Sequence, residues 1–432
     1  MTESDTESTT EGDLADFNPF DPDTLQCPFP HYAQMRTEEP VKHIPSLGMY
    51  LVTRHDQVLE VLRNPTRYSS VFGGASMPLS EEDRAKTHAV IAEGYPRVPT
   101  MLTADAPEHT RYRRLVSKAF TPRVIAELEP VIRNIANRLI DAWPTDGPIE
   151  FVEDYAVPLP VEVIAHALNV PESRMADFKR WSDDSIAGIG TQISLEERLR
   201  AERGVNEYQH YFAEQLELRR TEPRDDLLTN LLNARIEDDD PDVADQRPLD
   251  MAEMLSIVQQ LLVAGNETTT KLLTETVRLL SEHPDHWRRL KKDPALAGPV
   301  IEEALRLSTP TQGMFRIAAE AHDLDGVAIP EGARIVAVFA SANRDETVFP
   351  DPDTFDPSRE NLRDHLAFGK GMHFCLGAAL SRLEGKVTLE EFAKRIDDFT
   401  IDEDSQHVYF PSFLLRGLTR LDVSVTKQET PS

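Results

Sequence analysis

The chain has 432 residues, with 46 Lys and Arg against 75 Asp and Glu, which gives a formal charge of −29. A surface this acidic argues against general affinity for nucleic acid or for an anionic membrane, so any basic docking patch must be local. The two cysteines, Cys27 and Cys375, exclude a disulfide scaffold and a four-cysteine zinc site, and they fit a reducing cytosol.

Residues 1–17 are rich in Ser, Thr, Asp and Glu and are predicted to be a disordered acidic tail, because they lack the basic flank and apolar run of a signal peptide. Elsewhere no uncharged apolar stretch approaches the ~20 residues that span a bilayer. The sequence therefore predicts a cytoplasmic protein without a membrane anchor. Residues 18–432 are expected to form a single domain, since no repeat or linker separates independent units.

Strands are predicted towards the two ends of the chain. Residues 41–55 have the pattern of a strand, a turn centred on Gly48 and a second strand. A second strand pair is predicted from residues 327–329 and 334–338, joined by the turn at 330–332. Between about Pro122 and Leu307 the periodicity is mostly helical, with an acidic loop at 237–242. The expected fold is mainly α with small β-sheets.

The most informative predicted helix begins at Asp250, whose spacing to Glu253 is typical of a capping box, and continues to about Ser281. Its ~30 residues would span some 45 Å at about 1.5 Å per residue, so the helix should be central. The middle of this helix, residues 264–270, contains a glycine and three threonines, which weaken helix propensity. A local distortion is expected there.

Near the C-terminus, residues 368–377 read FGKGMHFCLG and precede a helix-like segment at 378–384. The two inner glycines permit a tight loop that approaches a large planar ligand closely. Cys375 then lies where a helix N-terminus would stabilise a thiolate. A lone cysteine is more often a small core hydrophobe, but the surrounding pattern favours a ligand here.

This ten-residue run resembles the haem-binding loop of the cytochrome P-450 family, because its Phe, two Gly, His, Cys and final Gly all hold their places. The resemblance extends in motif order from about Pro28 to Val425 and implies a cytochrome P-450 fold. It also implies haem b (iron protoporphyrin IX) as cofactor, with Cys375 as the iron ligand and Phe368 and Gly369 in the cofactor loop. A thiolate ligand donates electron density that favours cleavage of dioxygen.

Residues 264–269, AGNETT, are similar to the oxygen-activating helix segment of the same family. By itself, this segment is equally compatible with an ordinary helix whose polar residues face solvent. The resemblance implies that Glu267 and Thr268 relay protons, because reduction of dioxygen consumes protons.

Glu303 and Arg306 lie on one helical face at the i, i+3 spacing, which usually marks a solvated surface pair. The resemblance adds Arg359 and implies a buried structural network.

The resemblance also implies that four residues contact the haem propionates, namely His109, Arg113, Arg316 and His373. Arginine suits this role because it binds a carboxylate through two parallel hydrogen bonds, although a solvated surface charge remains the alternative for each position.

The expected substrate pocket is formed by three segments. The residues singled out are Gln260, Val263, Ala264 and Thr268 on the central helix, Thr311 and Gln312 within 311–315, and Phe413 within 410–414. These walls are mostly apolar, which predicts a hydrophobic small-molecule substrate. Terpenoid, steroid and fatty acid substrates all remain open.

The expected reaction is hydroxylation, in which one oxygen atom from O2 is inserted into the substrate. Electrons are expected from a separate ferredoxin and its NAD(P)H-dependent reductase, because the sequence contains no iron–sulfur cluster motif and no dinucleotide fingerprint. The expected docking surface carries Arg114, Lys118, Lys370 and Arg382. A peroxide-driven peroxygenase of the same fold and a non-catalytic haem gas sensor remain alternatives.

Overall fold

The computed structural model describes residues 14–72, 79–236, 243–401 and 407–428. Residues 1–13 of the predicted tail and the predicted acidic loop at 237–242 lie outside the described residues. The tail prediction is wrong for residues 14–17. Leu14 begins a short 3-10 turn, and Leu14 and Phe17 are buried in an apolar cluster with Tyr32 and Met35. Burial of these two apolar side chains fixes the backbone at this point.

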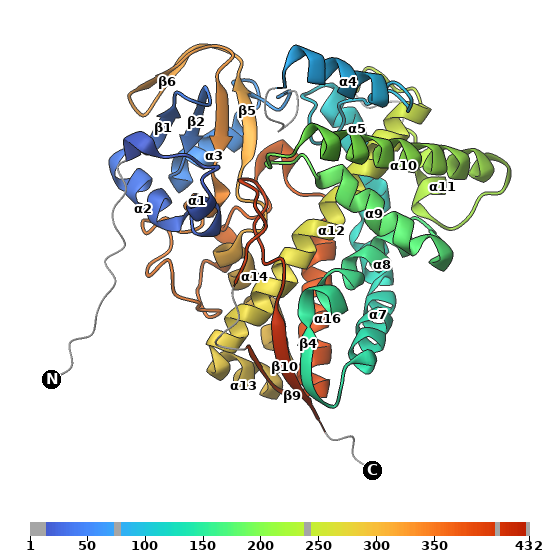
Figure 1. The fold of residues 1–432 in the computed structure, drawn as a ribbon, viewed down its shortest axis with the longest axis vertical. Coiled ribbons are helices and arrows are strands. Elements are labelled where there is room, and N and C mark those ends of the chain that lie inside the picture. Colours follow the sequence, from blue (N-terminus) through green and yellow to red (C-terminus); the bar gives the residue numbers. More distant parts are fainter. Residues whose placement is uncertain (1–13, 73–78, 237–242, 402–406, 429–432) are drawn as a thin grey trace.

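Helices make up most of the described chain, as predicted (Figure 1). They are α1 (Pro22–Gln26), α2 (Phe29–Glu38), α3 (His55–Arg63), α4 (Glu81–Ile91), α5 (Glu108–Ser117), α6 (Pro122–Glu127), α7 (Glu129–Ala142), α8 (Pro158–Ala167), α9 (Met175–Ile186), α10 (Leu195–Thr221), α11 (Leu227–Asn233), α12 (Met251–Glu282), α13 (Pro284–Lys292), α14 (Ala297–Ser308), α15 (Phe339–Ala342) and α16 (Ala378–Arg395). Within the described segments, no helix is long and apolar enough to cross a membrane.

The strands form small sheets. They are β1 (Val41–Ile44), β2 (Met49–Val52), β3 (Tyr68–Ser69), β4 (Asp146–Glu150), β5 (Met314–Ala318), β6 (His322–Leu324), β7 (Val327–Ile329), β8 (Arg334–Ala337), β9 (Ile396–Ile401) and β10 (Asp422–Lys427). One sheet has the order β1-β2-β8-β5-β3 and lies to one side of the helices, and another has the order β4-β10-β9 (Figure 1).

The first predicted strand pair is confirmed, whereas the second is wrong in its pairing. β1 and β2 are antiparallel, with Val41 opposite Val52, and the turn between them places Gly48 at a φ of 58°. β7 pairs with β6, while β8 lies between β2 and β5. Ile335 and Val336 of β8 are fully buried, so this strand gains more apolar contact in the centre of a sheet than in an isolated hairpin.

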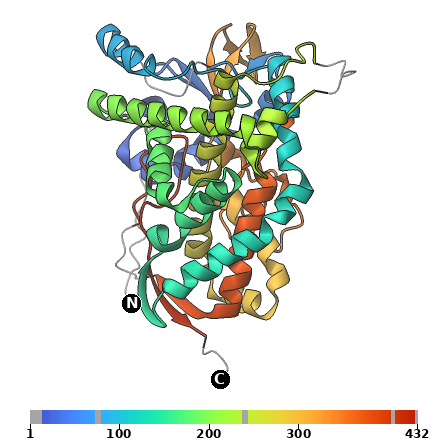
Figure 2. The ribbon, with the colours of Figure 1, turned by 90° about the vertical axis from the view of Figure 1, so that its right-hand side faces the viewer.

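Helix α12 passes through the middle of the molecule in both views (Figures 1 and 2). The capping box predicted at Asp250 and Glu253 is present. The distortion expected at residues 264–270 is absent, because the helix is continuous there. Thr268 donates a hydrogen bond to the Ala264 carbonyl at 2.7 Å and so remains compatible with helical backbone. A Cβ on Gly265 would lie 2.9 Å from the Ile164 side chain, so the glycine allows α8 to pack closely.

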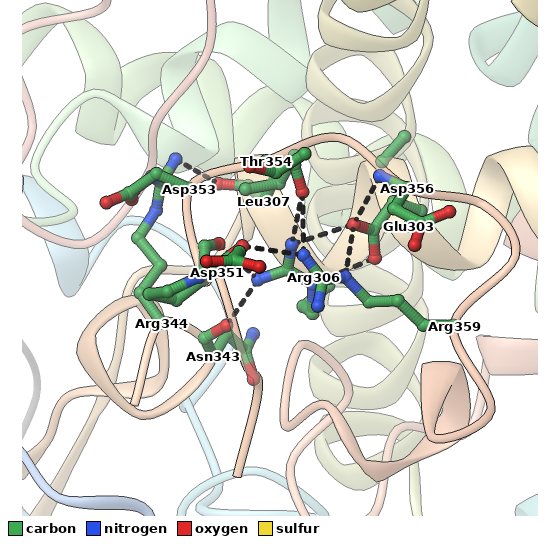
Figure 3. Close-up of polar contacts among 12 residues, drawn as sticks. Glu303, Arg306, Leu307, Asn343, Arg344, Asp351, Asp353, Thr354, Asp356 and Arg359 are labelled. Carbon is green, nitrogen blue, oxygen red and sulfur yellow. Dashed lines mark hydrogen bonds and ion pairs between the residues drawn. The ribbon is translucent and has the colours of Figure 1, made fainter. Parts of the chain in front are cut away.

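A buried ion network ties α14 to the segment that follows α15 (Figure 3). The Arg306 guanidinium donates to both oxygens of Glu303, at 2.7 and 2.8 Å. Arg359 donates to Glu303 Oε1 at 3.0 Å, and the Asp356 N–H donates to the same oxygen at 2.9 Å. Arg306 also donates to the Asn343 carbonyl at 2.9 Å. Glu303 and Arg306 are fully buried, as predicted.

We expect Glu303→Ala to destabilise the fold by about 3 to 5 kcal/mol, because Arg306 would keep a buried charge without its carboxylate. The exposed helical pair Arg123 and Glu127 provides a matched control, and Glu127→Ala should change stability by less than about 1 kcal/mol. Denaturant unfolding of the two variants measures the difference. Equal stability losses would contradict the importance of the buried network.

Candidate functional site

A cavity of about 450 Å³ lies beneath α12 and against the cysteine loop. Its lining is mostly apolar. Residues from the cysteine loop, α12 and the loop before α5 line it, including Phe368, Gly369, Cys375, Val263, Ala264, Thr268, Met101 and Leu102. The predicted catalytic and cofactor segments, which are far apart in sequence, therefore meet at one cavity.

Glycine geometry shapes the cysteine loop. Gly369 and Gly371 have φ angles of 63° and 73°, which side chains other than glycine rarely adopt. A Cβ on Gly371 would also lie 2.4 Å from the Leu62 carbonyl oxygen. The Cys375 N–H donates to the Phe368 carbonyl at 3.0 Å, which closes the loop. The loop thus fixes its cysteine immediately before α16.

Cys375 lines the cavity and lies near the N-terminus of α16. Burial raises the pKa of the Cys375 thiol, while the backbone N–H groups of Gly377 and Ala378 and the charge of Arg113 lower it. The two N–H groups and Arg113 favour the thiolate, but burial disfavours it more strongly, so the thiol pKa is raised overall. A bound cation over the sulfur would lower the thiol pKa further.

Two arginines line the cavity without a carboxylate partner. Arg316 is buried and donates to the Phe315 carbonyl at 2.7 Å, and burial lowers its pKa to about 10. Arg113 donates to the Phe374 carbonyl at 2.7 Å, and burial lowers its pKa. Neither makes an ion pair within the described part of the chain. A buried guanidinium of this kind favours an anionic ligand.

The two predicted histidines contact each other, with ring centroids 4.2 Å apart. His373 lines the cavity, but its nitrogens bond to the Ser70 hydroxyl at 2.9 Å and to the Met101 carbonyl at 3.0 Å. His109 is buried, and neither of its nitrogens has a hydrogen-bond partner among the described residues. Burial lowers the pKa of His109 to about 4 and that of His373 to about 3. His109 thus has unused hydrogen-bonding capacity beside the cavity.

The two predicted relay residues have different surroundings. Thr268 lines the cavity, and its hydroxyl donates to the Ala264 carbonyl. Glu267 is not part of the lining and forms an ion pair with Lys271. The Glu267 side chain is 16% exposed, whereas that of Lys271 is 4% exposed. Glu267 therefore has contact with solvent, and Thr268 has contact with the cavity.

Glu384 of α16 also lines the cavity and was missed by the sequence analysis. Thr269 donates to its Oε2 at 3.3 Å, and its Oε1 has no partner among the described residues. Burial raises the pKa of Glu384 to about 8. Leu380 and Val387 lie at i−4 and i+3, so a charged residue on an apolar helical face was the available signal.

The structure corrects two of the predicted pocket residues. Gln260, Val263, Ala264 and Thr311 line the cavity, but Gln312 and Phe413 do not. The Gln312 amide donates to the Ser308 carbonyl at 3.2 Å and so caps the end of α14. Phe413 instead packs against Phe20 in an apolar cluster near the N-terminus. Each side chain is held by a structural contact that local sequence did not indicate.

Some of the basic side chains predicted to form the docking surface make hydrogen bonds to other residues of this protein. Arg382 donates to both oxygens of Glu302, at 2.5 and 3.0 Å. Lys118 donates to the Arg235 carbonyl at 3.2 Å, and Lys370 reaches the cavity lining. Phe374, which immediately precedes the cavity cysteine, is 37% exposed. The surface near the cysteine is therefore both apolar and basic.

Comparison with known proteins agrees with this geometry. The family model for cytochrome P450 matches residues 194–408. Cytochrome P450 107B1 of Saccharopolyspora erythraea is 37% identical and the match covers 96% of this chain and 99% of that protein. Vitamin D(3) 25-hydroxylase of Pseudonocardia autotrophica is also 37% identical, over 93% of this chain and 94% of that one. The structure of CYP109Q5 from Chondromyces apiculatus has a TM-score of 0.83 and 37% identity, covering 96% of this chain and 100% of that one.

The chain combines a mainly helical fold with a cavity between a cysteine loop and a long central helix. This combination defines the class of haem-dependent oxygenases that the sequence resembles. With relatives of this similarity over nearly its full length, the chain belongs to the cytochrome P450 family, whose members are haem-binding monooxygenases.

We expect the contribution of Glu384 to the stability of the protein to fall as the pH rises from about 4.5 towards 8. Its folded-state pKa of about 8 lies above the ordinary glutamate value of 4.5, so the unfolded state loses its proton first and is favoured as the pH rises. Glu384→Gln should remove this slope and be more stable than the wild type at pH 8. The unfolding free energy of both proteins, measured from pH 5 to 8, tests this.

Exposed Glu127→Gln is the control and should leave the slope unchanged. A constant difference between wild type and Glu384→Gln across this range would contradict the raised pKa.

Proposed function

We propose that this cytochrome P450 hydroxylates a hydrophobic small molecule with O2, using haem b bound through Cys375. The observation that carries the proposal is the position of Cys375 at a mostly apolar cavity that also holds unpaired, buried Arg316. The thiol suits an iron, and the guanidinium suits a carboxylate of the same cofactor.

Several residues would hold the haem. Arg113, Arg316 and His109 would pair with its propionates, because their polar atoms lack carboxylate partners among the described residues. His373 would support His109 through their ring contact and would stay bonded to Ser70 and Met101. Phe368 and Gly369 would pack against the cofactor from the cysteine loop.

Once bound, the haem supplies the oxidising chemistry that transfers one oxygen atom to the substrate. Glu267 would take up protons from solvent, and its ion pair with Lys271 would hold the carboxylate in place. Thr268 would hold and pass a proton at the cavity surface through its hydroxyl. The apolar walls would bind the substrate and limit access of water.

The two alternatives receive less support. A peroxygenase does not need protons for dioxygen reduction, whereas Glu267 and Thr268 give this chain a solvent-side carboxylate next to a cavity hydroxyl. Against a gas sensor, the matched relatives include proteins named as hydroxylases. Relatives named as hydroxylases of vitamin D(3) and of 6-deoxyerythronolide B support a large hydrophobic substrate.

Electrons would come from a ferredoxin and an NAD(P)H-dependent ferredoxin reductase. The sequence contains two cysteines, which are too few for its own iron–sulfur cluster beside the haem ligand. Phe374, which is exposed, and Lys370 of the cysteine loop would form the docking surface together with Arg114 and Lys118. Arg114 and Lys118 follow Arg113 in the chain, and Arg113 donates to the Phe374 carbonyl. The acidic charge and the free cysteines support a cytoplasmic location.

We expect the reduced, carbon-monoxide-bound protein to absorb at the wavelength that gives the family its name, and Cys375→Ser to lose that band. Loss of the thiolate removes the sulfur-to-iron electron donation on which the band depends. Cys27→Ser is the matched control, because Cys27 is exposed and is not among the residues that line the cavity, and it should keep the band. A Cys375→Ser protein with the original band and full turnover would exclude Cys375 as ligand.

We expect Thr268→Ala to bind substrate and consume NADPH but to divert much of the flux from product to hydrogen peroxide, because proton delivery would lag behind electron delivery. The measurement is product and peroxide formed per NADPH, with a surrogate ferredoxin and reductase. Thr276→Ala is the control, since Thr276 also bonds to the carbonyl four residues earlier but is absent from the cavity lining. Equal coupling in both variants would remove Thr268 from the relay.

A further inference from the structure

Two cavity side chains on α12 hold the backbone of the loop that precedes α5. The Ser256 hydroxyl accepts a hydrogen bond from the Val98 N–H at 3.0 Å. One helical turn later, Gln260 Oε1 accepts from the Leu102 N–H at 3.3 Å. Ser256 and Gln260 both line the cavity. The loop is thus attached to the helix through the acceptor side of each side chain.

Ser256 and Gln260 each keep a hydrogen-bond donor that the contact with the loop does not use. A hydroxyl that accepts through its oxygen still carries its proton, and a glutamine whose oxygen is occupied still carries its NH2 group. The Leu102 N–H fixes the orientation of the Gln260 amide, because an amide nitrogen cannot accept. Among the described residues, neither the Ser256 proton nor the Gln260 amide nitrogen has a protein acceptor.

The charge on this side of the cavity favours a neutral ligand. Arg97 lines the cavity next to Val98, and it forms an ion pair with Glu202 of α10. The Glu202 side chain is 15% exposed, so the pair is partly withdrawn from water. A ligand carboxylate would have to compete with Glu202 in a protein whose formal charge is −29. A carbonyl or hydroxyl oxygen would accept from the two donors without that cost.

We propose that Ser256 and Gln260 form a subsite for a neutral carbonyl or hydroxyl oxygen on an otherwise apolar substrate. Gln260 precedes Thr268 by eight residues, which is about 12 Å along the helix axis. The subsite therefore holds the oxygen group at one end of the cavity and directs a remote carbon towards Thr268. This inference rests on the proposed monooxygenase function and specifies its substrate class.

The test compares ligands with one carbon skeleton and three end groups, namely a long-chain methyl ketone, the matching alkane and the matching carboxylate. Dissociation constants come from the Soret shift of the haem-loaded protein. We expect the ketone to bind about five- to tenfold more tightly than the alkane, as one or two neutral hydrogen bonds would give. The carboxylate should bind more weakly than the ketone.

Two variants of one residue separate the subsite from the attachment of the loop. Gln260→Leu removes both functions, whereas Gln260→Glu keeps an acceptor for the Leu102 N–H and removes the donor. Both should reduce the ratio of ketone to alkane affinity to about half of the wild-type ratio or less, because only the Ser256 hydroxyl would remain as a donor. Gln259→Leu is the control, because the neighbouring cavity amide bonds to the Ser185 hydroxyl at 3.3 Å, and the preference should persist.

The subsite is overturned if wild type binds ketone and alkane equally, or if Gln260→Glu retains the full wild-type preference for the ketone. It is also overturned if the carboxylate binds most tightly and Arg97→Leu removes that advantage. In each case a normal Soret band leaves the proposed function intact. A protein that binds no haem would overturn the proposed function and the subsite together.

Discussion

The position of Cys375 depends on the buried carboxylate of Glu303, which accepts hydrogen bonds from three polar groups. Glu303 accepts from Arg306, Arg359 and the Asp356 N–H, and Arg306 in turn donates to the Asn343 carbonyl. The side chain of Asn343 then accepts from the Leu366 N–H at 2.6 Å, two residues before the cysteine loop begins. Because buried charges cost free energy unless they are fully paired, this arrangement tolerates little displacement. A continuous set of polar contacts therefore runs from α14 to the loop that carries the thiol.

In the protein alone, several ionisable groups around the cavity are buried in surroundings that disfavour their charged forms. Burial lowers the pKa values of Arg316 and His109 and raises those of Cys375 and Glu384. Each shift records a charge that the surroundings do not satisfy. A ligand with a cation for the thiolate and anions for the arginine would relieve several of these costs at once. Folding of this region and binding of such a ligand should accordingly be linked.

One helix contributes to the different parts of the site because its positions face different neighbours. Ser256 and Gln260 face the loop before α5, Thr268 faces the cavity, and Glu267 faces Lys271 and solvent. Thr269 on the next position reaches Glu384 of α16. A regular helix repeats every 3.6 residues, so one continuous α12 can hold these groups in fixed relation without a break. Its continuity past Gly265 is therefore useful to the site.

The sequence by itself determined the features that depend on local pattern. The helical middle of the chain, the capping box at Asp250, the first hairpin and the cysteine loop all follow from spacing and residue type. Contacts between distant segments decided the rest. Tertiary packing removed Gln312 and Phe413 from the cavity, ordered Leu14 and Phe17, and placed β8 between β2 and β5. It also created the environment of Glu384, because burial and the unpaired oxygen depend on neighbours that local sequence does not specify.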